Sequence, residues 1–227
     1  MTDDLNALNT LININGDNVQ ALEIIFLTTM IALIPALVVM MTSFTRFLVS
    51  LSFLRTAMGT QQVPPNMVLT GLALFLTLFT MSPVIDEISA EAYTPYANEE
   101  ISQMEFLNRA QVPLKRFMLQ NMERSALQMF CDLAGEEMPD TVEEGMELPI
   151  RVITPAFATG ELRRAFQIGL YLYIPFLLVD VIVSSTLMSM GMVMLPPAMI
   201  STPFKLMLFV TLNGWELLFS TLIHTFH

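Results

Sequence analysis

Four methionines alternate with other residues in the segment "LMSMGMVMLPP" at positions 187–197, and their thioethers are the side chains whose spacing most suggests a chemical role. Thioether sulfur suits soft metal ions such as Cu(I), so one interpretation is a metal site. No cysteine or histidine lies nearby in the sequence to complete it. A second interpretation is a core that methionine fills adaptably, and a third is a deformable seal. The residues are Met188, Met190, Met192 and Met194.

The sequence carries no pattern that indicates catalysis. It has no phosphate-binding glycine loop, and its one cysteine, Cys131, excludes both an intramolecular disulfide and a cysteine-based metal cluster. The only two histidines, His224 and His227, lie at the C-terminal end, where we expect them to be solvated. We therefore expect a protein that is not an enzyme and that holds neither a cofactor nor a metal.

Composition points to a membrane. The 227 residues are 54% hydrophobic and only 14% charged, with a mean hydropathy of +0.60, whereas soluble domains carry about 25% charged residues. The net charge of −11 argues against a nucleic-acid partner. The first residues, "MTDDLNALNTLININGDN", lack the basic and apolar regions of a secretory signal, so either none exists or it has been removed.

The elements that must position the methionines are apolar and arranged in two pairs. Apolar stretches run over about 22–41, 67–85, 165–190 and 199–223, each near the roughly 20 residues that span a bilayer. The second stretch of each pair follows a Pro-Pro dipeptide, Pro64–Pro65 or Pro196–Pro197. Because proline lacks an N–H and disfavours helix in the residue before it, these dipeptides predict sharp helix corners.

The fold predicted from these patterns is all-α, with two bent hydrophobic helical hairpins separated by an acidic helical insertion. We expect a polar N-terminal segment at 1–20, a first hairpin at 21–85, the water-facing insertion at 86–160 and a second hairpin at 161–227. Within the insertion, Gly135 is a predicted helix stop, and 138–155 is predicted to be a loop and an extended return segment.

Five charged residues fit poorly in simple membrane spans. A lone charge in lipid costs several kcal/mol, and a charge buried in protein needs a partner. We expect several to pair with a neighbouring chain in a ring. An ordinary four-helix membrane protein with internal ion pairs stays an alternative. For Glu161 a position in the first turn of a helix, where a carboxylate is favoured, explains it equally well. The five are Arg46, Arg55, Glu161, Asp180 and Lys205.

The methionine spacing predicts an extended segment. Alternate positions of an extended chain share one side, and Gly191 with the following Pro-Pro corner would break the helix and let the segment bend inward. In a ring of copies, the thioethers would then converge on an axis and close it.

Two long runs resemble the FliP family, the flagellar biosynthetic proteins of the type III export apparatus. They are "TSFTRFLVSLSFLRTAMGTQQVPPNMVLTGLALFLTLFTMSPVIDEI" at 42–88 and "ELRRAFQIGLYLYIPFLLVDVIVSSTLMSMGMVMLPPAMISTPFKLMLFVTLNGWELL" at 161–218. Virulence-secretion relatives share "GTQQVPPN" and pieces like "STPFKL", whereas "SFTR", "SPVIDEI" and "PLKRFML" favour the flagellar branch.

The resemblance implies a pentameric ring that joins FliQ and FliR subunits in the core of the export gate. This gate would lie in the bacterial cytoplasmic membrane at the flagellar basal body, beside other membrane proteins of the apparatus and membrane lipid. It would pass unfolded flagellar proteins. The family's methionine-rich loop falls on Met192, Val193 and Met194, and Val193 departs from the methionine that relatives often carry. Met188 and Met190 are adjacent candidates only.

Two alternatives to a pore subunit follow from the same residues. One is a scaffold subunit that templates the gate without lining its pore. The other is a small-solute transporter with repeated hairpins, which would place polar ligands at its broken helices. The break in this sequence carries methionines instead.

Overall fold

The computed structural model of the chain describes residues 11–14, 17–60, 62–192 and 194–226. It consists of two compact units, Met1–Val39 and Met40–His227. In the first unit, β1 (Leu11–Ile14) and β2 (Asp17–Gln20) pair antiparallel, with Ile12 opposite Val19. Helix α2 (Ala21–Met41) follows. This two-stranded hairpin is a small addition to the all-α class that the sequence predicts.

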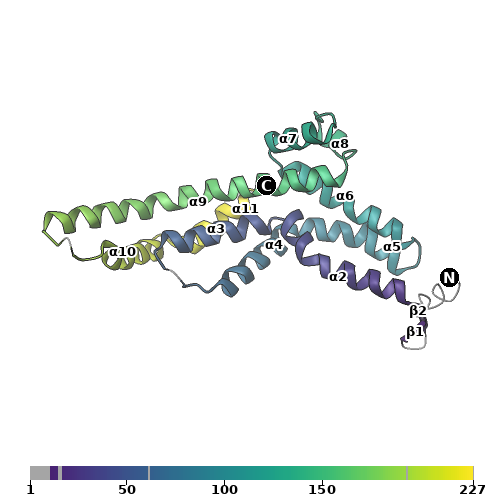
Figure 1. Cartoon of the computed structure of the whole chain (residues 1–227), viewed down its shortest axis with the longest axis horizontal. Coiled ribbons are helices and arrows are strands. Elements are labelled where there is room, and N and C mark those ends of the chain that lie inside the picture. Colours follow the sequence, from purple (N-terminus) through teal and green to yellow (C-terminus); the bar gives the residue numbers. More distant parts are fainter. Residues whose placement is uncertain (1–10, 15–16, 61, 193, 227) are drawn as a thin grey trace, which may run out of the picture. The chain divides into compact units, whose positions relative to one another are not determined.

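Within its described residues, the second unit is built of helices joined by turns and loops (Figure 1). A continuous rod contains α4 (Asn66–Ile88), the π-helical turn η1 (Ser89–Tyr93) and α5 (Thr94–Ala97). The remaining helices are α3 (Phe44–Ala57), α6 (Gln103–Asn121), α7 (Arg124–Ala134), α8 (Val142–Gly145), α9 (Ile150–Ser189), α10 (Pro197–Thr211) and α11 (Gly214–His224).

The apolar helices meet the length expected of membrane spans. Two of them, Asn66–Ala97 and Ile150–Ser189, are each long and apolar enough to cross a membrane. Two bent pairs, Pro35–Met41 with Phe44–Ala57 and Pro197–Thr211 with Gly214–His224, would bring the number to four if each pair formed one span. The predicted helical class with bent, apolar helix pairs is therefore confirmed.

Helix α9 begins earlier than the sequence indicated. The structure is helical from Ile150, where an extended return segment was predicted, so that prediction is wrong. Pro149 and Pro155 suggested an irregular chain, but Pro149 precedes the first helical residue and Pro155 lies inside the helix. Burial of the apolar side chains that recur at helical spacing outweighs the lost hydrogen bond. Those fully or nearly fully buried are Val152, Ile153, Ala156 and Phe157.

The last apolar stretch is two helices rather than one. Helices α10 and α11 meet at a bend of 65°, and Asn213 between them has a left-handed backbone with φ 49°. A Cβ atom on Gly214 would lie 2.2 Å from the ring of Phe209, so only glycine fits this close approach. The Asn-Gly pair is a turn signal that the apolar composition around it obscured.

The insertion is organised around capped helices. The Ser102 hydroxyl accepts a hydrogen bond from the Glu105 N–H at the start of α6, and Thr141 caps Glu144 in the same way at α8. Helix α7 ends at Gly135 with φ +72°, which confirms the predicted stop. The Lys115 ammonium donates to the Met146 carbonyl oxygen at 2.8 Å, and burial lowers the pKa of this lysine.

Close packing joins α3 to α9. A Cβ atom on Gly169 would lie 2.4 Å from the Phe53 ring, so the glycine lets the Phe53 side chain of α3 approach the α9 backbone. Phe47, Leu51 and Leu54 of α3 are also fully or almost fully buried. This helix pair carries four of the five charged residues that the sequence analysis singled out, and the fifth, Lys205, lies on α10.

Candidate functional site

The end of α9 forms a turn that we call the methionine turn, comprising the described residues of 188–194. Met192 N–H donates to the Leu187 carbonyl at 3.0 Å, and Gly191 N–H donates to the Met188 carbonyl at 3.1 Å. Gly191 has φ +76°. Together these features are a Schellman motif, in which a left-handed glycine satisfies the last carbonyls of a helix. The sequence-predicted break at Gly191 therefore has a specific local cause.

The methionine side chains of this turn project outward. Met188 and Met190 are each 63% exposed, Met192 is 45% exposed and Met194 is 97% exposed. Met188 lies in the last turn of α9, because the helix continues to Ser189. Met190 keeps a right-handed helical backbone after the helix end, and Gly191 is left-handed. The predicted extended segment is therefore wrong over residues 188–191, where hydrogen bonds of the helix end set the backbone. Val193, which the sequence analysis also named, lies outside the described residues.

Prolines close the turn and start the next helix. Pro196 is extended, with ψ 118°, and Pro197 is the first residue of α10, a position where its missing N–H costs nothing. At the corresponding corner of the first hairpin, Pro65 precedes the first residue of α4. Arg55 donates from Nη1 to the Pro64 carbonyl at 3.3 Å and also to the Asn66 side chain.

An apolar groove of about 470 Å³ lies between α9 and α10, next to the methionine turn. Its walls carry branched and aromatic side chains, with the Thr186 hydroxyl committed to the Ile182 carbonyl at 2.8 Å. The residues that line this groove offer no charged ligand for a metal or cofactor. The lining residues are Val179, Ile182, Val183, Thr186, Leu187, Ile200 and Phe204.

A charged clamp holds α9 and α10 together beside this groove. The Lys205 ammonium is 2.6 Å from Asp180 Oδ2, and the Ser201 hydroxyl donates to Asp180 Oδ1 at 2.7 Å. Lys205 also donates to the Ala57 carbonyl at 3.2 Å, at the end of α3. The Lys205 side chain is 6% exposed and that of Asp180 32%. Three helices therefore meet at one ion pair.

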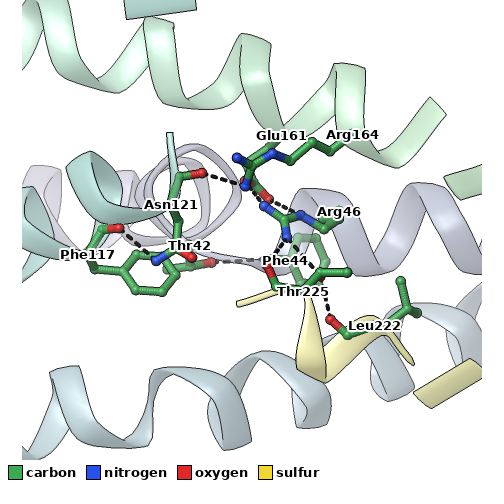
Figure 2. A network of polar contacts seen from close by, with 9 residues as sticks. All are labelled: Thr42, Phe44, Arg46, Phe117, Asn121, Glu161, Arg164, Leu222 and Thr225. Carbon is green, nitrogen blue, oxygen red and sulfur yellow. Dashed lines mark hydrogen bonds and ion pairs between the residues drawn. The ribbon is translucent and has the colours of Figure 1, made fainter. Parts of the chain in front are cut away.

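A second and more deeply buried ion pair lies near the insertion (Figure 2). Arg46 of α3 donates from Nε to Glu161 Oε2 of α9 at 2.8 Å and from Nη2 to the other carboxylate oxygen. The side chains are 0% and 1% exposed. A charge this deeply buried is tolerated only when it is paired and hydrogen-bonded, as the bidentate geometry provides here.

The C-terminal residues complete this cage. Arg46 Nη1 donates to the Thr225 carbonyl at 3.1 Å and to its hydroxyl at 2.8 Å. The guanidinium carbon lies 3.6 Å from the centre of the Phe226 ring, a cation–π arrangement. Phe226 in turn stacks on Phe117 of the insertion, with ring centres 6.1 Å apart. The cage therefore connects α3, α9, α6 and the C-terminal end.

A neighbouring arginine ties α9 to the insertion. Arg164 donates from Nη1 to the Asn121 carbonyl at 2.7 Å, at the end of α6, as Figure 2 shows. Sequence reasoning did not identify Asn121, Ser201, Thr225 or Phe226. Their roles depend on residues more than a hundred positions away or on a helix-to-helix contact, so no local pattern signals them.

The five charged residues predicted to need partners all have them within this chain. Glu161 forms an ion pair with Arg46, and Asp180 forms one with Lys205. Arg55 donates a hydrogen bond to the Asn66 side chain at the proline corner that follows α3. Helix packing brings Arg46 and Glu161, 115 positions apart, into bonding distance within this chain. The expected pairing of several of these charges with a neighbouring chain stays a prediction. Glu161 is an ion-pair partner well inside α9, eleven residues beyond the helix start at Ile150, so the first-turn explanation does not apply.

Within the described residues, no group of three or more histidine, cysteine, aspartate or glutamate side chains could hold a metal ion. Cys131 is fully buried in the insertion. Burial raises the pKa of its thiol, and the carboxylates of Asp132 and Glu136 raise it further. Such a thiol is a packing residue with little thiolate character at neutral pH.

Residues 27–222 match the family model described as "FliP family". A flagellar biosynthetic protein FliP of Aquifex aeolicus is 48% identical over 212 residues, covering 93% of this chain and 88% of the relative. The protein of the same name from Bacillus subtilis is 43% identical, covering 96% of this chain and 100% of the relative. The one from Pectobacterium carotovorum is 46% identical, with coverages of 91% and 79%.

Proposed function

This chain belongs to the FliP family, and from that premise we propose that it is a pore-forming core subunit of the flagellar type III export gate. It passes unfolded flagellar proteins across the cytoplasmic membrane. Its copies form a pentameric ring together with FliQ and FliR subunits, in contact with lipid and with other membrane proteins of the export apparatus. The methionine turn seals the closed pore.

One observation supports the proposal that the methionine turn seals the pore. A turn whose backbone is fixed by its own hydrogen bonds presents four thioether side chains outward, with Met194 97% exposed. Exposing four large apolar groups to water is unfavourable, so the turn needs apolar surroundings in the assembled protein. Equivalent turns from several copies supply those surroundings when they meet at an axis. Flexible thioethers then fill the axis and move apart around a passing chain.

The remainder of the site supports a passive pore rather than catalysis. The groove beside the turn is apolar, and the nearest charges, Asp180 and Lys205, neutralise each other. The clamp therefore positions α9 against α10 and has no free acid or base to offer. A transporter that bound small polar solutes would need ligands at the break.

The scaffold alternative is compatible with a separate observation. Large side chains on α4 and α9 are exposed, including Met67 at 83% and Tyr171 at 72%. Surfaces of this kind mark contacts with other proteins or lipid. These surfaces are compatible with either role, so only a test of the methionine turn distinguishes a pore subunit from a scaffold.

Replacing Met192 and Met194 by alanine tests the seal. We expect the complex to assemble with normal subunit masses while its conductance to small ions, in a planar bilayer without substrate, rises several-fold. The matched control replaces Met104 and Met129, two exposed methionines of the insertion, by alanine. If the Met192→Ala, Met194→Ala variant assembled normally and its conductance were unchanged, the seal hypothesis would be contradicted and the scaffold function would be favoured.

A further inference from the structure

Both strands of the second hairpin are interrupted at the same level. Pro175 lies inside α9 and has no N–H to bond the carbonyl oxygen of Tyr171, four residues earlier. On the returning strand, Asn213 lies at the 65° bend between α10 and α11 and has a left-handed backbone. Pro175 and Gly214 line the same apolar groove of about 330 Å³. The two interruptions therefore face each other across the hairpin.

On one side of this level, both strands are fixed to the rest of the second unit, which we call the body. A Cβ atom on Gly169 of α9 would lie 2.4 Å from the Phe53 ring of α3, so the helices are in direct contact there. Arg46 of α3 binds Glu161 of α9 and also Thr225, which follows α11. The cage thus holds α9 and the end of α11 in one packed body.

On the other side, the two strands are fixed mainly to each other. We call residues 176–212 the hairpin tip, which ends in the methionine turn. Asp180 accepts hydrogen bonds from Lys205 at 2.6 Å and from Ser201 at 2.7 Å, so the clamp joins α9 to α10 within the tip. Lys205 also donates to the Ala57 carbonyl of the body at 3.2 Å, the longest of these three contacts.

We propose that Pro175 and the Asn213–Gly214 bend form a hinge on which the hairpin tip swings as one piece. Helices bend where their main-chain hydrogen bonding is already interrupted, and hinges concentrate motion at a few such residues. The swing costs no helical hydrogen bond at Pro175, because that position has none to lose. It keeps the Asp180–Lys205 ion pair, whose two residues move together, and lengthens the bond from Lys205 to Ala57.

The hinge would give the methionine turn a lever. From Pro175 to its last residue, Ser189, helix α9 extends about 21 Å at a rise of about 1.5 Å per residue. A rotation of about 10° at the hinge would move the turn by about 4 Å. In a ring of copies, a step that rests on the proposed function, such movements would draw the turns from the axis and open the seal without unwinding the Schellman motif.

Replacing Pro175 by alanine tests the hinge, because alanine can donate the hydrogen bond to Tyr171 that proline cannot. Spin labels on cysteines at Thr70 of α4 and Ser185 of the tip, both exposed, report the distance between body and tip by pulsed electron paramagnetic resonance. The assembled complex carries Cys131→Ala, and labelled copies are diluted with unlabelled ones. We expect a broad distance distribution that narrows at least two-fold in the Pro175→Ala variant. Equal widths would overturn the proposal.

The matched control is Pro155→Ala, at the other proline inside α9, which lies in the body. It should leave the distance distribution as in the wild type. Hydrogen exchange gives a second measurement that needs no label: amides of residues 176–179 should exchange several-fold more slowly in the Pro175→Ala variant and at an unchanged rate in the control. Unchanged exchange in the Pro175→Ala variant, or equal narrowing in both variants, would also contradict the hinge.

The outcomes separate the hinge from the proposed function. Export of a flagellar protein should fall several-fold in the Pro175→Ala variant, while the closed complex keeps its low ion conductance. A narrowed distribution with unchanged export would refute the role of the hinge in opening the seal. A hinge that behaves as expected, together with unchanged conductance in the Met192→Ala, Met194→Ala variant, would refute the seal function and leave the hinge.

Discussion

Arg46 is the residue whose environment explains most about the fold. Its guanidinium is bonded on three sides, by Glu161, Thr225 and the Phe226 ring. Four nitrogen-to-oxygen hydrogen bonds to two residues leave little of its donor capacity unused. Because burial removes water from both charges, the ion pair adds little net free energy to folding. Its main contribution is to fix how three chain segments pack against one another.

Removing one partner of this pair leaves a buried charge alone. We expect Glu161→Gln or Arg46→Met to destabilise the protein by about 3–5 kcal/mol, measured as a loss of thermal stability and of assembled complex. The double variant Arg46→Met, Glu161→Leu should recover much of that loss, since neither charge remains.

The exposed pair between Arg109 and Glu105 provides the control, with side chains 45% and 49% exposed. Arg109→Ala should change stability by less than about 1 kcal/mol, because solvent screens such pairs. Equal losses for Arg46→Met and Arg109→Ala would contradict the buried cage.

At the scale of elements, the hairpin of α9 and α10 depends on its clamp. Asp180→Lys places two cations side by side at Lys205, and we expect the hairpin to open and the ring to be lost, as native mass spectrometry would show. The swap Asp180→Lys, Lys205→Asp restores opposite charges and should recover part of the assembly. A normal ring in the Asp180→Lys variant would mean that the clamp does not hold the hairpin.

The α3–α9 contact depends on a missing side chain. Gly169→Ala would bring a Cβ atom within 2.4 Å of the Phe53 ring, and we expect it to destabilise the protein by about 1–3 kcal/mol through overpacking. Gly71 has nothing within 4 Å of its Cβ position, so Gly71→Ala in α4 should be neutral or stabilise by about 0.5–1 kcal/mol. Thermal unfolding of both variants in the same detergent would compare them.

At the scale of the whole second unit, α9 connects two distant sites, the Arg46 cage and the methionine turn. Its 40 residues extend about 60 Å, well beyond the roughly 30 Å of bilayer hydrocarbon. The Arg46 cage lies near one end, where α6 and α7 pack, and the methionine turn lies at the other (Figure 1). One continuous helix therefore links the insertion to the candidate seal.

Phe226 tests how firmly the insertion is joined to this helix. Its ring is 7% exposed and contacts the rings of Phe47 and Phe117. Phe226→Ala should cost about 3–5 kcal/mol through loss of burial and the cavity left behind. It should also increase hydrogen exchange at the end of α6. Ile223→Ala, at a half-buried position of the preceding turn, should cost less. Unaltered exchange in the Phe226→Ala variant would show that the insertion is held by other contacts.

The sequence by itself determined the helical class, the apolar pairs, the proline corners and the break at Gly191. These features follow from local rules: the absence of an N–H in proline, the left-handed freedom of glycine and the length of an apolar run. The same local rules misled at Ile150, where burial of Val152 and Ile153 sustains a helix next to prolines. They also passed over Asn213, because a single polar residue scarcely alters an apolar average.

Only the tertiary structure decided which charges meet. Arg46 and Glu161 are 115 positions apart, and Lys205 and Asp180 are 25 apart on two antiparallel helices. A sequence shows that a buried charge needs a partner, but the partner is chosen by the angle and register at which helices pack. The same packing brought Thr225 and Phe226 to Arg46. Electrostatic pairing in a low-dielectric interior depends on distances of a few ångströms, and those distances exist only once the chain is folded.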